Sequence, residues 1–345
     1  QPNVHAVAYL KKGETPGLAE MEDRLEISPA WEVWISPEET LVPLHSTEQV
    51  DLSIETRRHR EVDSPSPLEV TLPESDPLDT MIQPSRARRT STSVDWKIPD
   101  SADPGEHHVV AKLESGGRTY DATSIITLAD VKVAEDLNVG VVQSYDDTLP
   151  KALDRLGVSY SLLNESDVRS GDLSGYDTIL IDIRAYLERQ DLVESNGRFL
   201  KYCSEGGHLV VFYHKTFEWN DQDPPLAPLP LLLSRNRITD ENAPVQILDP
   251  DHPILNWPNK IGPSDWEGWV QERGLYFPGE YDKGYDEIVA FTDPNEQPLR
   301  SGILSAKVGK GTYVYTSLVF YRELKALVPG AYRLFANLIS YGHGG

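Results

Sequence analysis

Cysteine is nearly absent from this sequence: Cys203 is the only one in 345 residues. A single cysteine excludes an internal disulfide and any zinc site made of paired cysteines. It leaves the redox compartment of the protein open. Hydrophobic residues make up 39% of the chain and its mean hydropathy is −0.42, which fits a globular protein with apolar cores.

Positive charge is also scarce. Lys and Arg number 32 against 55 Asp and Glu, which gives an acidic protein with a formal net charge of −23. Because such a field repels phosphate backbones, we expect no nucleic-acid partner. Long apolar runs are missing as well. None approaches the roughly 18 residues of a membrane-spanning helix, so we expect no transmembrane segment.

The chain begins Gln1-Pro2-Asn3, with neither an initiator methionine nor a signal segment. This start is expected of a mature product or of a fragment of a longer protein. The length predicts two domains. We place an N-terminal extension at residues 1–30, with a strand at 5–10 and a short helix or loop at 17–25. A first domain follows at 31–130 and a second at 131–345.

Short alternating runs fill residues 31–130. Val50, Leu52 and Ile54 alternate with polar residues, and the same alternation recurs at 68–72, 94–98, 107–113 and 119–127. Breaks rich in Pro, Ser and Gly separate the runs. About seven short strands with frequent turns and no helical pattern predict an all-β immunoglobulin-like sandwich.

From residue 137 onward, strand and helix patterns alternate. Strand patterns occur at 137–142, 158–163, 176–182, 208–213, 287–291, 302–307 and 312–318, and helix patterns at 146–157, 192–204 and 329–341. Asp147, Thr148 and Pro150 form a helix N-terminal signature. Strands alternating with helices predict βαβ units and a mostly parallel sheet.

The central strand of that sheet is expected at His208–Tyr213, after the turn Glu205-Gly206-Gly207. Its unbroken apolar run is typical of a strand buried on both faces. In open α/β sheets, ligands and catalytic groups lie beyond the C-terminal ends of such strands. We therefore expect a functional site around His214.

Several longer phrases resemble one protein family. They include GDLSGYDTI at 171–179, DPDHPIL at 249–255, GWVQERGLYF at 268–277 and VPGAYRLFANL at 328–338. On these phrases, residues 137–342 resemble the flavodoxin-like, class I glutamine amidotransferase-like region of large bacterial PIG-L (LmbE-like) deacetylases. The sandwich before them is similar to the immunoglobulin-like module of the same proteins. The Asp-His-Pro-Ile phrase is also similar to ThuA-like proteins.

The resemblance implies an α/β flavodoxin-like (class I glutamine amidotransferase-like) domain preceded by an all-β immunoglobulin-like sandwich. It also implies a PIG-L deacetylase domain as a partner, in cis or in trans. The catalytic motifs of these families are missing from the sequence, however. A PIG-L deacetylase binds zinc through an Ala-His-Pro-Asp-Asp motif and a later His pair. Here His252-Pro253 follows Asp249 and Asp251 in the wrong order, and no His-x-x-His occurs.

The amidotransferase nucleophile is missing too. A class I amidotransferase needs a cysteine on the turn after the central strand and a distal histidine. That turn holds His214-Lys215-Thr216, Cys203 falls in the preceding helix, and the strand at 313–318 ends without a histidine. The missing motifs favour a chain that has no catalytic activity, cofactor or metal of its own. An enzymatic function remains an alternative.

Two groups of candidate residues follow from the strand ends and from the aromatic content. His214, Asp182 and Arg184 are the candidates for acid–base catalysis. Aromatic faces stack on sugar rings while charged groups bond hydroxyls. The residues of these types that we expect to bind a ligand are Tyr186, Tyr213, His214, Lys215, Trp219, Trp266, Glu267 and Trp269. The alternatives are a polar rim for His214 and core or lid packing for the aromatic residues.

Two acidic groups are open to a metal or a structural interpretation. Asp146 and Asp147 either join a metal site with Asp182 or cap the following helix, and we favour the cap. Asp249, Asp251 and His252 either bind a metal or form a rigid turn, and we favour the turn.

The leading hypothesis is a non-catalytic accessory or carbohydrate-binding region that works with a PIG-L-type N-acetyl-sugar deacetylase. The alternative is a ThuA-like or hydrolase-type enzyme that acts on sugars at the strand ends. A third possibility is a structural or assembly module. Bacterial sandwiches of this type are typical of extracytoplasmic proteins, so a periplasmic or secreted location is expected.

Overall fold

The computed structural model describes residues 4–12, 15–23, 29–59, 61–62, 64–84 and 88–343. Its contacts divide the chain into two compact units. The first comprises Gln1–Glu38, Val50–Trp96 and His108–Ile125. The second comprises Glu39–Gln49, Lys97–His107 and Ile126–Gly345.

The chain starts with an antiparallel hairpin of β1 (Val4–Lys12) and β2 (Thr15–Asp23), in which Val4 lies opposite Asp23. The predicted strand at 5–10 is confirmed. The prediction of a helix or loop at 17–25 is wrong over 17–23, because this stretch pairs along its length with β1; residues 24 and 25 lie outside the described residues.

The described residues between 31 and 129 hold eight strands in two sheets. One sheet has the order β3 (Trp31–Ser36), β5 (Gln49–Arg58), β8 (Arg89–Lys97). The other has the order β4 (Glu39–Pro43), β10 (Arg118–Ala129), β9 (Gly105–Ser115), β6 (Ser66–Thr71), β7 (Leu78–Ile82). The alternation seen in the sequence buries one face of each strand, as in β5, where Val50, Leu52 and Ile54 are buried.

The second unit is built on an eight-stranded sheet. Its order is β12 (Ser159–Leu162), β11 (Asn138–Val142), β13 (Thr178–Ile181), β14 (His208–Val211), β22 (Gly311–Thr316), β21 (Leu299–Val308), β20 (Asp286–Phe291), β17 (Val245–Ile247). The pairings from β12 to β22 are parallel. Those from β22 to β17 are antiparallel.

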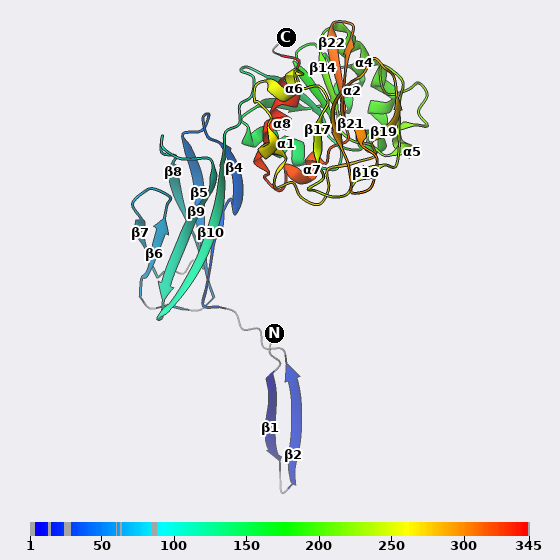
Figure 1. Ribbon diagram of the computed structural model, residues 1–345. Coiled ribbons are helices and arrows are strands. Elements are labelled where there is room, and N and C mark those ends of the chain that lie inside the picture. The colour runs from blue at the N-terminus through cyan, green and yellow to red at the C-terminus, as the bar shows by residue number, and fades with distance from the viewer. Residues whose placement is uncertain are drawn as a thin grey trace. The chain divides into compact units, whose positions relative to one another are not determined.

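Alternate residues of the parallel strands enter two different cores. Leu180, Val210 and Val314 pack with α1 (Thr148–Arg155) and α8 (Pro329–Ser340) in one core. Their neighbours along the same strands pack with α4 (Gln190–Glu205) in the other. Figure 1 shows α1, α6 (Pro253–Asn256) and α8 on one side of the sheet, and α2 (Glu165–Ser170) and α4 on the other. Both faces are therefore covered, which explains the unbroken apolar runs.

The remaining elements are short. They are α3 (Ala185–Glu188), α5 (Thr216–Trp219), α7 (Phe320–Glu323), the 3-10 turn η1 (Pro263–Trp266), and the strand pairs β15 (Leu231–Leu233) with β19 (Pro278–Tyr281) and β16 (Arg237–Ile238) with β18 (Gly274–Leu275). In the described part of the chain, no helix has the length and apolar character needed to cross a membrane.

The predicted fold class is wrong. A flavodoxin-like, amidotransferase-like α/β domain behind an immunoglobulin-like sandwich implied a mostly parallel sheet, whereas the sheet of the second unit is mixed and the chain is mostly β with several separate sheets. The physical cause is the turn Gly309–Gly311, which folds β22 back onto β21 as a hairpin. Strands β20 and β17 then extend the sheet in the antiparallel sense.

Candidate functional site

Several polar and aromatic side chains meet where the parallel strands end. Tyr145 follows β11, Arg184 follows β13, Tyr213 and Lys215 follow β14, and Tyr321 follows β22. Tyr276, which follows β18, stacks on Tyr213 with ring centroids 6.1 Å apart and planes 3° apart. We call Tyr145, Arg184, Tyr213, Lys215, Tyr276 and Tyr321 the strand-end cluster.

Contacts within the strand-end cluster join residues that are distant in sequence. The ring of Tyr321 lies 5.8 Å from that of Tyr213. The ammonium of Lys215 lies 6.0 Å from the ring of Tyr276, within the range of a cation–π contact. The phenol of Tyr145 interacts with the guanidinium of Arg184. Burial is the main cause that raises the pKa of Tyr213, so its hydroxyl acts as a neutral hydrogen-bonding group.

The backbone around the cluster is unusual. Arg184, Gln271 and Tyr276 adopt the left-handed conformation, with φ of 55°, 72° and 52°. Residues with side chains adopt it at a cost, and such conformations gather at functional sites. At Arg184 the turn begins α3 directly after the strand and brings the guanidinium to Glu218.

The carboxylate of Glu218 holds the guanidinium of Arg184 in place. Its Nε and Nη2 lie 2.7 and 2.6 Å from Oε1 of Glu218, whose side chain is fully buried. Oε2 of Glu218 accepts the backbone N–H of Lys215 at 3.0 Å. Glu218 therefore positions both cationic residues of the cluster. Lys215 forms no ion pair with any carboxylate among the residues that the structure describes.

His214 lies beneath the strand-end cluster and is fully buried. Its Nδ1–H donates to the carbonyl of Phe212 at 2.8 Å, and its Nε2 accepts the N–H of Tyr186 at 3.2 Å. A carbonyl only accepts and an amide N–H only donates, so this pair of partners fixes one neutral tautomer. Burial lowers the pKa of His214 to about 3. The ring holds the ends of two strands together and has no nitrogen left for a substrate.

Asp182 is also buried at the strand ends. Oδ2 accepts both the N–H (3.1 Å) and the hydroxyl (2.8 Å) of Ser144, and Oδ1 accepts the N–H of Ile183 (2.8 Å). Burial raises the pKa of Asp182 to about 7, against these hydrogen bonds. The carboxyl anchors the loop that carries Tyr145. The three catalytic candidates are thus near one another, but His214 and Asp182 use both of their polar atoms on neighbouring backbone and Ser144.

The aromatic residues predicted to bind a ligand lie in two separate places. Tyr186 and Trp219 are buried side by side against His214, with Trp219 packing edge-on to Tyr315. Trp266 and Trp269 are buried in the other core, 5.4 Å apart. Glu267 is exposed beside them. Tyr213 and Lys215 alone of the predicted ligand-binding set belong to the strand-end cluster.

Exposed aromatic side chains stand at the edge of this cluster instead. Tyr145 is 60% exposed and Phe217 57%, more than any other large apolar side chain among the described residues. The phenol of Tyr145 contacts Arg184, and Phe217 directly precedes Glu218, the residue that binds Arg184. The sequence reasoning missed Tyr145, Phe217, Tyr276 and Tyr321. A signal was present for Tyr145 and Phe217, because each follows a predicted strand end within a few residues.

The predicted acidic alternatives have structural roles. Oδ1 of Asp146 accepts the N–H of Thr148 at the start of α1, whereas Asp147, the N-cap residue, makes no capping hydrogen bond with its side chain and pairs with Lys151. Nδ1 of His252 accepts the N–H of Ile254 at the start of α6. The residues that the structure describes contain no cluster of His, Cys, Asp and Glu suited to a metal ion. Cys203 is buried, its thiol donates to the carbonyl of Thr312, and burial raises its pKa to about 12.

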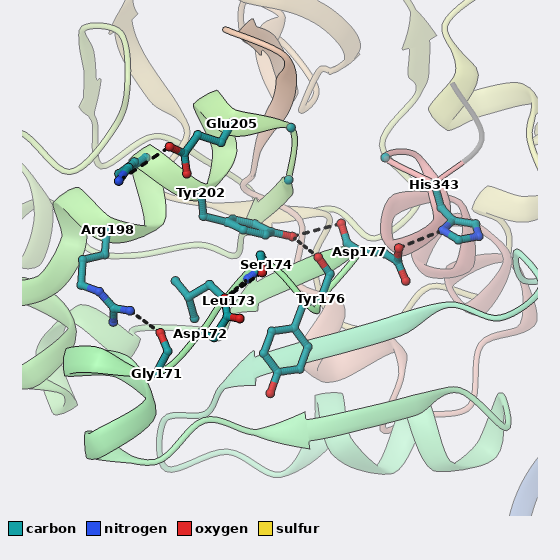
Figure 2. Close-up of a pocket in the computed structure, with 14 residues that line it drawn as sticks. Gly171, Asp172, Leu173, Ser174, Tyr176, Asp177, Arg198, Tyr202, Glu205 and His343 are labelled. Atoms are coloured by element: carbon teal, nitrogen blue, oxygen red, sulfur yellow. Dashed lines mark hydrogen bonds and ion pairs between the residues drawn. The ribbon is translucent and has the colours of Figure 1, made fainter.

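A groove of about 680 Å³ lies at the opposite edge of the sheet, where β13 and β14 begin. Figure 2 shows Tyr202 reaching the carbonyls of Tyr176 and Asp177, and the Asp177 carboxylate facing His343. Arg198 bonds the carbonyl of Gly171. These side chains join the loop at 171–177 to α4 and to the end of the chain, so the groove is lined by groups that already have partners.

The sequence finds no match among protein-family models and none among curated proteins. Similarities to solved structures are more numerous, and three of them are as follows. An exo-β-1,4-mannosidase from Opitutaceae bacterium strain TAV5 is 12% identical with a TM-score of 0.38, over 60% of this chain and 36% of that one. A family 123 glycoside hydrolase from Clostridium perfringens is 8% identical with a TM-score of 0.22, over 60% and 42%.

A calcium-binding mutant of Bacteroides uniformis β-glucuronidase 2 is 12% identical with a TM-score of 0.24, over 56% of this chain and 34% of that one. The matched part is thus about a third to two fifths of each of these longer proteins. All three are glycoside hydrolases. Likenesses at these TM-scores do not establish a shared fold.

Proposed function

We propose that this chain binds a carbohydrate at the strand-end cluster without transforming it. The observation that carries the proposal is the exposed ring of Tyr145, which contacts Arg184 in a cluster that also holds the stacked rings of Tyr213 and Tyr276. Sugar rings present apolar C–H faces that stack on aromatic rings, while their hydroxyls need donors and acceptors close by. The Lys215 ammonium and the tyrosine hydroxyls supply those groups.

The hydrogen bonds of His214 and Asp182 and the burial of Cys203 support binding without turnover. His214 is neutral and bonded at both nitrogens. Asp182 accepts three hydrogen bonds from its own loops. Cys203 is buried away from the strand ends. The enzyme alternative needed His214 and Asp182 as acid and base, and neither presents an unbonded atom to a substrate.

The rigidity of the cluster suits a binding site. Buried Glu218 fixes Arg184 and the backbone of Lys215, and His214 ties the ends of β13 and β14 together. A site whose side chains are already positioned loses little conformational entropy when a ligand binds. From the sequence resemblance alone we further infer a PIG-L-type N-acetyl-sugar deacetylase as the partner, in cis or in trans, and an extracytoplasmic location.

A glycan array followed by calorimetric titration of the strongest glycan tests the binding. Tyr145→Ala should weaken binding about tenfold, because a stacked ring contributes roughly 1 kcal/mol or more. Trp257→Ala is the matched control: it removes an exposed aromatic side chain outside the cluster and should leave the affinity unchanged. The proposal fails if no glycan binds, or if Tyr145→Ala binds as tightly as the control.

A further inference from the structure

A second cleft, of about 400 Å³, lies beside η1 and the edge strand β17. Its walls are mostly apolar and include Pro244, Val245, Ile247, Ile261 and Trp266. None of its lining residues belongs to the strand-end cluster. Its volume is within the range of small-molecule sites, and its apolar lining suits the hydrophobic body of a ligand.

One cation lines this apolar cleft. Arg273 is 4% exposed. Its Nη1 donates to the carbonyl of Trp266 at 2.6 Å, its Nη2 lies 3.4 Å from the carbonyl of Ala243, and its guanidinium stacks on Trp269 at 5.3 Å. Its Nε has no hydrogen-bond partner. An arginine has five N–H groups, so the donors of this side chain are not exhausted by the protein.

The charge of Arg273 is only partly compensated nearby. Glu323, followed by Asp240 and Glu241, favours its charge; burial raises the pKa of Glu323 to about 7, so the strongest of these three carboxyls is substantially protonated near neutral pH. The carboxylate that lines the cleft, Glu267, is exposed at its rim. The printed hydrogen bonds of Arg273 are to backbone carbonyls, and its buried Nε has no partner, so an anionic group at this guanidinium would gain a charge-assisted hydrogen bond.

We propose that this cleft binds a small monocarboxylate with an aromatic or branched aliphatic body. The apolar part packs against Trp266, Ile247 and Ile261, and the carboxylate turns toward Arg273. The site is separate from the carbohydrate site and does not depend on it. No covalent step is involved.

Calorimetric titration of the full chain with sodium benzoate, compared with benzyl alcohol, tests the charge requirement. The two probes share a ring and differ in the anionic group. We expect benzoate to bind about tenfold more tightly or better, since a buried charged hydrogen bond contributes on the order of 1.5–3 kcal/mol. Absence of benzoate binding, or equal affinity for the two probes, overturns the proposal.

Substitution of Arg273 itself is a poor test because it is buried and holds two loop carbonyls. Gly262 offers a better one. It lines the cleft in an extended conformation, and a Cβ placed there meets nothing within 4 Å. Gly262→Leu should fill the cleft and abolish benzoate binding. Gly175→Leu, at another open glycine outside the cleft, should bind as wild type. Unchanged binding by Gly262→Leu places benzoate elsewhere and refutes the site.

A charge pair at the rim gives an independent readout. Ile247 is 40% exposed on β17, so either charge is tolerated there. Ile247→Glu should weaken benzoate binding about fivefold and Ile247→Lys should strengthen it, by Coulomb interaction at the mouth of the cleft. Benzyl alcohol should not distinguish the two variants. Identical benzoate affinities for Ile247→Glu and Ile247→Lys count against the proposal.

Discussion

His214 and His208 show that burial can turn a titratable side chain into a neutral structural one. Both rings are bonded at both nitrogens to groups of the protein, and burial lowers their pKa values to about 3 and about 4. They are protonated more readily in the unfolded chain, so their contribution to stability is complete above about pH 6.5 and is lost as the pH falls toward 3. Their role in the fold therefore depends on being neutral.

Buried Glu323 has the opposite pH dependence. Burial raises its pKa from 4.5 to about 7, so the folded chain binds its proton more tightly than the unfolded chain. Its effect on the free energy of unfolding is absent below about pH 4.5 and becomes fully unfavourable above about pH 7.

Glu323→Gln should remove that effect. A glutamine oxygen still accepts the N–H of Val270, which now lies 2.9 Å from Oε2, and Oε1 has no partner to lose. Urea unfolding should find the variant more stable than wild type at pH 8, by about 1–3 kcal/mol, and equally stable at pH 4.5.

Glu267→Gln, at an exposed carboxylate, is the control and should differ from wild type by less than about 0.5 kcal/mol at either pH. A Glu323→Gln effect of the same size at both pH values would contradict the assigned titration. So would a wild type that is the more stable protein at pH 8.

At the scale of elements, the C-terminal end of α4 and the β21–β22 turn depend on each other. Lys310 N–H donates to the carbonyl of Ser204, and Thr312 N–H to that of Gly207. These bonds satisfy a carbonyl at the end of the helix. The backbones approach so closely that a Cβ on Gly311 would lie 2.1 Å from the carbonyl oxygen of Cys203.

Gly311→Ala should therefore destabilise the chain by about 1–3 kcal/mol, because backbone rather than a flexible side chain must move. Gly175→Ala, where an added Cβ has open space, is the matched control and should cost less than about 0.5 kcal/mol. Equal unfolding midpoints in urea for the two variants would show that the turn and the helix end are not tightly coupled.

The sequence predicts the strands of the main sheet well and their direction poorly. Apolar runs at 208–213 and 312–318 mark strands covered on both faces, but a parallel and an antiparallel strand in that position have the same pattern. The short glycine-containing turn Gly309–Gly311 is a signal of an antiparallel pair, because so short a connection cannot join parallel strands. Strands of two to four residues, such as β16 and β18, are too short for any periodicity.

The candidate site was predictable where it depends on strand ends and unpredictable elsewhere. Tyr213 ends a predicted strand, and Arg184 and Lys215 each come two residues after one. Tyr276 reaches Tyr213 only through the path of the loop around β18, which sequence periodicity does not reveal. The tryptophans were expected to bind a ligand, yet Trp219 and Trp269 are buried in the cores, because sequence alone does not distinguish a stacking ring from a packing one.

At the scale of the whole molecule, the segment Glu39–Gln49 belongs to the second unit although it precedes most of the first in sequence. Leu41, on β4, is 1% exposed and lies in the same core cluster as Val131, Leu149 and Leu153. The predicted domain boundary at 130/131 separates Leu41 from this core. A fragment of residues 131–345 should accordingly unfold at a lower temperature than the second unit does in the full chain.

Leu41→Ala in the full chain tests this packing without truncation. Loss of a fully buried leucine costs about 2–5 kcal/mol through lost burial and the cavity left behind, and the loss should appear in the unfolding of the second unit. Tryptophan fluorescence reports that transition, since Trp219, Trp266 and Trp269 lie in its cores. Leu78→Ala, at a leucine 45% exposed on β7, should leave the same transition within about 0.5 kcal/mol of wild type. If Leu41→Ala and Leu78→Ala shift it equally, β4 is not part of the core of the second unit.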